Sequence, residues 1–459
     1  MLTMPLGLRH IWIVAVASLG QMIGTAVATL AGVIIPMINI IRHPELSSAM
    51  QGLIGAADLI GITIGSVVFG RLSDRFGYLV FFRGCPALVL VASVAAALIP
   101  DTLMLAAMLF VIGIGIGGEY SLDSDYISEL MPLKWRSLMV GAAKTMSALG
   151  NIVVALLCYI CISDWKTAAR WPDLMWIVAA MATLMLLSRI FFYQSPKWLQ
   201  SHGKTKAAEK AVADFLGKNV YMPIATPHEE EKTNSARNVD AHESGKSFLC
   251  RYRNKIILSG MPWACEGLGV YGIGVFLPVL VMALGIEHAN EDVTAIMHVA
   301  SSVWTTFLIS CIILPGFIIG LLLIKRNHNI LTMQTVGFTV CAAALSVLMA
   351  AYCLHWNRWI SIAAFMIFEL FLNIGPHLVT FVLPPRLYPV DDRGTGTGIA
   401  AAMGKAGAVV AVFIIPLLLK AGGPPLVLAV SAIVMLAGAA FTFVFGRIIG
   451  WKTGKGASC

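Results

Sequence analysis

Long apolar stretches, each about as long as a bilayer-crossing helix, recur along almost the whole chain. The ten-residue alternation of polar and apolar positions that is typical of membrane β-barrels does not occur among them. The pattern therefore predicts an all-α membrane protein with twelve transmembrane helices. The predicted spans are 9–41, 51–70, 79–99, 103–131, 137–162, 173–194, 254–285, 293–324, 329–354, 358–384, 394–420 and 424–448.

One long polar insertion divides these spans into two sets of six. It predicts an N-terminal six-helix bundle (1–194), a cytoplasmic linker (195–253) and a C-terminal six-helix bundle (254–459). An even number of spans places both termini on the same side of the membrane. Most of the 32 Lys and Arg residues fall on that side, so the positive-inside rule makes it cytoplasmic. We expect the protein to lie in a plasma membrane, such as a prokaryotic inner membrane.

The composition excludes several classes of function. Of the 459 residues, 58% are hydrophobic and 12% charged, which is not the composition of a soluble enzyme. The net charge of +8 reflects where the positive residues lie relative to the bilayer, and we expect no nucleic-acid partner. The nine cysteines lack metal-ligand spacing, and the sequence contains no evident nucleophile and base pair. We therefore expect no enzyme activity, no metal and no cofactor.

Acidic residues within residues 113–137 form the most informative feature of the chain. A helix over 103–131 places Glu119 near its middle, where a carboxylate is costly and by default marks an ion or substrate pathway. Asp123 follows one turn later on the same face, whereas Glu129 lies nearer the cytoplasmic end. Burial favours the protonated form of a carboxyl group, so Glu119 is the predicted carrier of a coupling proton.

Three further charged residues lie inside predicted spans. Lys405 follows Arg393 by 12 residues, about 18 Å along a helix, and therefore lies near the bilayer midplane. A lysine there needs a partner, and Glu119 in the other half is the predicted one, either directly or with an anionic substrate between them. Lys144 adds a second positive charge. Asp58 is either a pathway residue or a group that reaches water.

The two halves share a spacing. Pro132 and Arg136 bracket the start of the fifth span as P-x-x-x-R, and Pro389 and Arg393 bracket the eleventh in the same way. A parallel duplication of a six-helix unit would leave the same spacing in both halves. Such an architecture favours alternating access to a central site between the halves.

Two segments resemble motifs of the major facilitator superfamily. GRLSDRFG at 70–77 is similar to the loop motif between the second and third spans of that superfamily, and E-x-x-P-x-x-x-R at 129–136 recurs in sugar porters and their relatives. The resemblance implies the twelve-helix fold. It also implies a charged inner gate formed by Asp74, Arg75, Glu129, Arg136 and, in the second half, Arg393.

Three other segments resemble the phosphate:proton symporter branch of that superfamily. GIGIGGEYSL at 113–122 is similar to the branch's G-I-G-I-G-G-D-Y-P-L, and residues 371–410 share its pattern at many spaced positions, among them Asn373 and Lys405. Trp263 and Tyr271 match a third motif. In that branch, the position of His377 binds phosphate and the position of Lys405 lies in the central site.

The chain departs from the branch at several of these positions. His377 replaces the phosphate-binding Asn, Gly267 replaces an acid with Glu266 one residue earlier, and a one-residue offset turns a helical side chain by about 100°. Ser147 replaces a Gln, and the first span offers Gln21 but none of the acids expected there. These differences leave the substrate open between phosphate and another small anion.

Together these features predict a proton-coupled secondary transporter of a phosphate-like oxyanion or small organic acid, driven by the proton gradient and functional as a monomer. Neutral-solute (sugar-type) transport and nutrient sensing are the alternatives. The predicted partners are the small anion, protons and the lipid bilayer. The predicted site comprises proton-coupling residues Glu119, Asp123 and Asp58; substrate-binding residues Lys405, His377, Tyr120, Trp263, Tyr271, Asn373, Lys144, Glu266, Ser147 and Gln21; and gating residues Asp74, Arg75, Glu129, Arg136 and Arg393.

Overall fold

A computed structural model describes residues 7–132, 135–201, 203–216, 248–274, 277, 280, 294–326, 328–388 and 393–450. The described secondary structure is helical, as the hydropathy pattern predicts. The elements of the first half are α1 (Leu8–Ala17), α2 (Leu19–Ile41), α3 (Ser48–Phe76), α4 (Tyr78–Leu98), α5 (Thr102–Leu130), α6 (Arg136–Trp165), η1 (Ala168–Leu174), α7 (Met175–Ser188) and η2 (Arg189–Phe191).

Three short helices lie in the predicted linker region: α8 (Pro196–Ser201), α9 (Thr205–Leu216) and α11 (Phe248–Arg251). The elements of the second half are α12 (Arg253–Gly267), the π-helical segment η3 (Leu268–Ile273), α14 (Ala295–Ser310), α15 (Ile313–Lys325), α16 (Ile330–Cys353), α17 (Arg358–Ile374), α18 (Pro376–Val382), α19 (Pro384–Leu387) and α20 (Arg393–Ile448).

Polar residues fix where several of the long helices begin. The side chain of Asp101 accepts hydrogen bonds from the backbone N–H groups of Leu103 and Met104 at the start of α5. Ser47 and Asn357 cap α3 and α17 in the same manner. These side chains satisfy N–H groups that have no partner within the helix, and each cap contributes about 1 kcal/mol.

Within the described residues, 11 helical stretches are long and apolar enough to cross a membrane. The last of them, Gly396–Ile448, is interrupted at Gly423, which has φ 66° and so adopts a conformation that favours glycine. The two ends of α20 lie against the same apolar cluster, which contains Leu331 and Tyr388. Tyr388 packs against Gly396 near the start of α20, and Leu331 packs against Gly446 near its end. The chain thus doubles back at Gly423, and its two arms correspond to the last two predicted spans.

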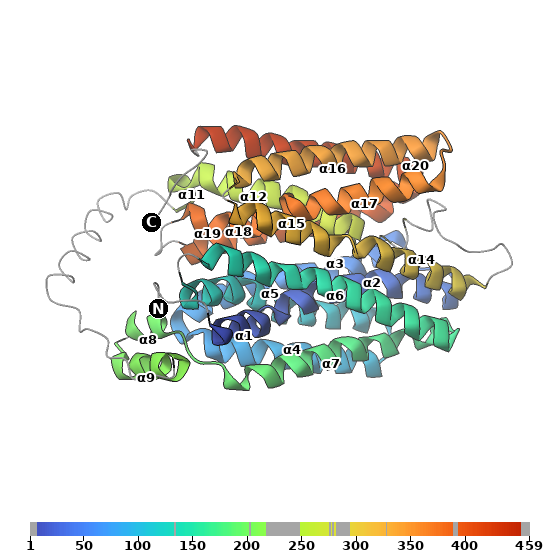
Figure 1. Cartoon of the computed structure of the whole chain (residues 1–459). Helices are drawn as coiled ribbons and strands as arrows, with labels where there is room; N and C mark the ends of the chain where they lie inside the picture. Colours follow the sequence, from blue (N-terminus) through green and yellow to red (C-terminus); the bar gives the residue numbers. More distant parts are fainter. Residues whose placement is uncertain are drawn as a thin grey trace.

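The helices form two layers that run side by side (Figure 1). The first half of the chain, coloured blue to green, makes the lower layer of this view, and the second half, coloured yellow to red, makes the upper one. The short helices α8 and α9 lie at the same end of the molecule as α1. The division into two bundles and a linker remains a prediction as regards its exact boundaries.

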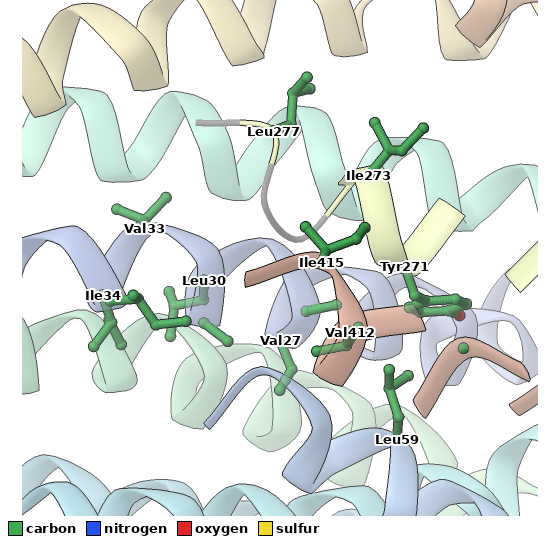
Figure 2. Packing of buried hydrophobic residues seen from close by; sticks show 14 of the residues in the cluster. Val27, Leu30, Val33, Ile34, Leu59, Tyr271, Ile273, Leu277, Val412 and Ile415 are labelled. Atoms are coloured by element: carbon green, nitrogen blue, oxygen red, sulfur yellow. The ribbon is translucent and has the colours of Figure 1, made fainter. Parts of the chain in front are cut away.

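Apolar side chains from both halves meet in one buried cluster. Figure 2 shows Val27 and Leu30 of α2 and Leu59 of α3 near Val412 and Ile415 of α20. All five side chains are buried. The cluster brings helices of the two halves into direct contact beside the polar residues described below.

Glycines allow α3 and α5 to pack backbone against backbone. A Cβ atom at Gly113 would lie 2.0 Å from the backbone oxygen of Asp58, and one at Gly61 would lie 2.2 Å from that of Phe110. Such approaches are possible only without a side chain. This close packing holds α3, which carries Asp58, against α5, which carries Glu119.

Candidate functional site

A hydrogen bond between two tyrosines joins the halves at the centre of the molecule. The hydroxyls of Tyr120 on α5 and Tyr271 on η3 are 2.9 Å apart, and both side chains are buried. The π-helical turn over Leu268–Ile273 presents Tyr271 at this point, and such turns are frequent at functional sites. Two buried lysines, described next, pack against the rings of these tyrosines.

Two buried lysines, one from each half, lie beside the same ring. The Nζ atom of Lys144 is 5.0 Å from the ring centroid of Tyr120, and that of Lys405 is 4.3 Å from it. Lys405 also donates a hydrogen bond to the hydroxyl of Tyr271. Both side chains are at most 3% exposed. The ring faces help to stabilise positive charges that water does not reach.

Glu119 is not the partner of Lys405, contrary to the pairing expected from the sequence. Glu119 instead forms an ion pair with Arg189, which is on η2 of the same half. Arg189 also donates to the backbone oxygen of Ala17 at 2.9 Å, and its Nη2 lies 3.6 Å from Asp123. All three ionic side chains are completely buried. Arg189, which the sequence analysis did not single out, therefore lies inside the first half and not at the membrane surface.

Gln21 connects this acidic cluster to Lys144. Its Oε1 accepts a hydrogen bond from Lys144 at 3.3 Å, and its Nε2 lies 3.5 Å from Asp123 Oδ2. Ser147 donates to the backbone oxygen of Lys144 at 2.7 Å, one turn along α6. Glu119, Asp123, Gln21 and Lys144 thus share one polar network in the first half.

The second half contributes a chain of hydrogen-bonding groups. The NH₂ group of Asn373 donates to the backbone oxygen of Glu369 at 2.7 Å, so its Oδ1 faces His377 Nδ1 at 2.8 Å. Nδ1 therefore carries the hydrogen, and Nε2 lies 3.7 Å from Glu266 Oε1. Two turns of helix separate Glu369 from His377, and the break at Gly375 lies between them. Glu266 is buried beside the lysines and interacts electrostatically with both.

The remaining predicted pathway and binding residues also face this region. Asp58 is completely buried on α3, accepts the backbone N–H of Leu59 at 2.8 Å and interacts electrostatically with Lys405. Trp263 packs edge-on against Phe381, with ring centroids 6.4 Å apart, and covers the backbone of Gly404 next to Lys405. Close backbone contact between α12 and α20 at Gly407 holds Lys405 in place.

A small cavity lies between the halves, and one of its lining residues, Ser147, is one turn from Lys144 on α6. Hydroxyl, amide, imidazole and carboxylate groups supply its polar lining. These are Thr29, Ser147 and Asn151 from the first half and Thr306, Ser310, Glu369, Asn373 and His377 from the second.

The predicted inner gate remains a prediction. The backbone of Asp74 and Arg75 ends α3, that of Glu129 lies in α5 and that of Arg393 begins α20, but their side chains lie outside the described part of the structure. Arg136 begins α6 and is half-buried.

Several residues of the site were missed by the sequence reasoning. Arg189 follows an apolar run at the end of a span, so it looked like a charge at the membrane surface. Asn151, Thr306 and Ser310 lie singly in apolar spans, where one polar group gives only a weak signal. Glu369 was a visible intramembrane acid, and by default such an acid is a functional candidate.

Comparison with known proteins gives consistent matches over most of the chain. A family model described as "Sugar (and other) transporter" matches residues 40–446. The "Inner membrane metabolite transport protein YgcS" of Escherichia coli (strain K12) is 26% identical, covering 87% of this chain and 83% of that protein. The "Repressible high-affinity phosphate permease" of Neurospora crassa is 24% identical, covering 96% of this chain and 85% of that protein.

A solved structure shares the fold. The structure described as "Partially occluded inward open conformation of the xylose transporter XylE from E. coli" matches with a TM-score of 0.77 at 17% identity, covering 96% of this chain and 98% of that chain. At this identity the likeness shows the fold alone, which is that of the major facilitator superfamily.

Proposed function

The chain belongs to the sugar (and other) transporter family, and we propose that it is a proton-coupled carrier of a small anion. Membership makes it a multi-pass membrane protein and a secondary transporter of small solutes with the major facilitator fold. The nature of the solute and the role of protons are the proposed parts.

The observation that carries the proposal is the pair of buried lysines without a carboxylate partner. Among the described residues, no carboxylate oxygen lies within 4.0 Å of the ammonium group of Lys144 or Lys405. Each ammonium has three donors; Lys144 donates to the amide oxygen of Gln21, and Lys405 donates to the hydroxyl of Tyr271. Buried charges without a counter-ion are costly. An anion bound between them would remove that cost.

The balance of buried charges supports coupling to protons. Buried acids outnumber buried bases in the described spans, so a bound anion would add to an existing excess of negative charge if every acid were ionised. Protonation of an acid when the anion binds would remove the excess, and the two events would then assist each other. The acids are Asp58, Glu119, Asp123, Glu266 and Glu369, and the bases are Lys144, Arg189 and Lys405.

Phosphate and small carboxylates are the leading candidates for the anion. The phosphate permease of Neurospora crassa among the relatives supports the first. His377 takes the position of a phosphate-binding Asn in the branch that this chain resembles. Its Nδ1–H group donates to Asn373 and is therefore not available to a ligand, which supports a small carboxylate over phosphate. Both need the lysines.

Uptake into proteoliposomes tests the proposal. With an inward proton gradient, labelled phosphate or a labelled small carboxylate should accumulate, and Lys405→Met should reduce that uptake about tenfold or more because a charge-assisted contact is lost. Thr339→Val, an exposed position on α16, is the control and should transport normally. Accumulation of hexoses in place of every anion would contradict the proposal.

Transport of a neutral sugar is the second candidate. The family description and the hydroxyl and amide lining of the cavity favour it. A neutral solute, however, would leave the ammonium groups of Lys144 and Lys405 without a carboxylate in direct contact. Competition by hexoses in the same uptake assay separates the two candidates.

We also propose a location in the plasma (inner) membrane with both termini cytoplasmic. The name of the Escherichia coli relative and the distribution of Lys and Arg support this orientation. Function as a monomer remains a prediction.

A further inference from the structure

One buried side chain joins the lysine of the first half to its acidic cluster. Gln21 on α2 is completely buried, and its Oε1 accepts a hydrogen bond from Lys144 at 3.3 Å while its Nε2 lies 3.5 Å from Asp123 Oδ2. An amide has an acceptor at one end and donors at the other. This arrangement therefore holds only while Asp123 Oδ2 presents an acceptor to Gln21, which means that this oxygen carries no hydrogen.

The geometry of the cluster indicates which oxygen takes up a proton. Glu119 accepts a hydrogen bond directly from Arg189, whereas Asp123 Oδ1 lies 3.6 Å from the same side chain. The closer cation favours the ionised form of Glu119 more, so Asp123 is the acid that is protonated first. Asp123 Oδ1 faces the guanidinium donors and has to remain an acceptor. The hydrogen therefore belongs on Oδ2, opposite the NH₂ group of Gln21.

Protonation of this oxygen would leave two donors face to face. Rotation of the Gln21 amide by half a turn removes the conflict, because Oε1 then accepts from the new O–H group of Asp123. The same rotation turns the NH₂ group toward Lys144, whose ammonium is itself a donor. Lys144 thereby loses this acceptor, and the N–H group that donated to it becomes available to an anion.

Gln21 occupies a unique place among the groups near Asp123. The titratable and charged side chains that face Asp123 belong to α4, α5 and η2 and are Cys85, Tyr120, Glu119 and Arg189. Among the described residues, Gln21 alone has polar contacts with both Asp123 and Lys144. A direct route from the acid to the lysine therefore runs through this one amide.

We propose that Gln21 is a positioning residue that makes Lys144 available to an anion when Asp123 is protonated. The inference rests on the proposed proton-coupled anion transport and assigns the contact by which the two binding events assist each other. Without this contact, protonation of the cluster would act on the anion only through the change in charge. In this role Gln21 acts through Lys144 and need not touch the anion.

A double-mutant cycle on anion affinity tests the inference. Equilibrium binding of labelled phosphate and of labelled lactate to the detergent-purified protein is measured at one fixed alkaline pH, so that the charge of each ligand is constant. Asp123→Asn places an NH₂ group where the protonated acid has its O–H group and should tighten binding about tenfold, because it frees Lys144. In a Gln21→Met background, the same substitution should change the affinity by no more than about threefold, which is the direct effect of removing a negative charge.

Two further variants separate coupling from structure. Gln334→Met makes the same change at another completely buried glutamine, on α16, whose amide has no hydrogen-bond partner within the described part of the structure. It should leave the affinity and the effect of Asp123→Asn unchanged. Gln21→Glu keeps the shape of the side chain but gives Lys144 a carboxylate partner. It should weaken anion binding about tenfold or more, with or without Asp123→Asn.

The outcomes distinguish this inference from the proposed function. An equally large effect of Asp123→Asn in the Gln21→Met background would overturn the inference while anion transport stands, and would point instead to a proton shared between Asp123 and Glu119. Wild-type affinity in Gln21→Glu would overturn it as well. Binding of neither anion by the wild-type protein, or binding that Lys405→Met does not weaken, would overturn both the inference and the proposed function.

Discussion

Two carboxylates share a single guanidinium in the first half of the protein. Glu119 pairs with Arg189, Asp123 lies 3.6 Å from the same side chain, and all three are completely buried. Fully ionised, this cluster carries one excess negative charge, which is costly at such a position. One proton neutralises it. The cluster, rather than Glu119 alone, is therefore the unit that we expect to take up a coupling proton.

Replacing Glu119 by Gln should uncouple transport from the proton gradient. Asp123 and Arg189 would then form a neutral pair without a proton, so nothing in the cluster would need protonation. We expect accumulation driven by the gradient to fall at least about tenfold, while exchange of internal for external anion continues, because exchange requires no net proton movement. Labelled uptake and counterflow in the same proteoliposomes measure both.

Glu45→Gln serves as the control for this variant because Glu45 is an exposed acid between α2 and α3. It should behave as the wild-type protein does. If Glu119→Gln accumulated the anion against its gradient as well as wild type, the assignment of the proton to this cluster would be wrong.

The sequence identified the buried ionisable residues better than it identified their partners. Glu119, Lys144 and Lys405 are visible because charges are rare in apolar spans. Their pairing depends on which helices are neighbours and how each helix is rotated, and hydropathy contains neither. Arg189 was hidden at a span end, and so Glu119 was matched with the wrong cation.

At the scale of elements, the α3 and α5 pair shows how small residues set the positions of functional groups. The backbone oxygen of Asp58 occupies the place that a side chain on Gly113 would need. A backbone atom cannot move aside as the end of a flexible side chain can. The predicted polar residues on both helices depend on this contact.

Gly113→Ala should therefore destabilise the protein. The added methyl group would meet backbone at 2.0 Å, and overpacking of this kind costs about 1–3 kcal/mol in the free energy of unfolding. Thermal unfolding of the detergent-purified protein should show a lower midpoint than wild type.

Gly84→Ala on α4 is the matched control, because a Cβ atom there would have nothing within 4 Å. It removes a helical glycine without a clash and should leave stability unchanged or raise it by up to about 1 kcal/mol. Equal thermal midpoints for the two variants would show that α3 and α5 do not pack as described.

Hydropathy predicted the spans but not their interruptions. The predicted eighth span is divided between α14 and α15, and the tenth is broken at Gly375, where the backbone leaves the helical conformation. Both interruptions lie in apolar sequence, so the pattern of hydrophobic positions continues through them. The break at Gly375 matters for the site because it lies in the chain between Asn373 and His377, whose side chains form a hydrogen bond across it.

At the scale of the whole molecule, the two halves touch at both ends of α6. Near one end, the rings of Tyr159 and Trp304 are 4.8 Å apart. Near the other, a Cβ atom at Gly141 would lie 2.7 Å from the side chain of Leu321. Lys144 lies between Gly141 and Tyr159 along α6. The halves therefore touch on both sides of the buried lysines.

Alternating access requires each of these contacts to open in turn. In a background in which the nine native cysteines are replaced by serine, cysteine pairs at Tyr159 and Trp304, or at Gly141 and Leu321, should abolish transport when joined by a short cleavable cross-linker. Cleavage of the linker should restore it. Anion uptake by each variant, before and after cross-linking, measures the effect.

A pair within the second half, Leu331 and Gly446, tests whether the halves move as units. Their side-chain positions also lie in contact, at 2.8 Å. Joining them should leave transport intact, because no opening between the halves is required. Transport that survives both cross-links between the halves would exclude the proposed mechanism.

Proton movement into the vesicle lumen tests coupling more directly than anion movement does. Proteoliposomes containing a pH-sensitive dye, with the membrane potential clamped and no imposed pH gradient, receive phosphate or a small carboxylate from outside. Proton-coupled transport predicts that the lumen acidifies when a transported anion is added and that Lys405→Met abolishes the signal. Entry of labelled anion with no change in lumen pH would contradict proton-coupled transport.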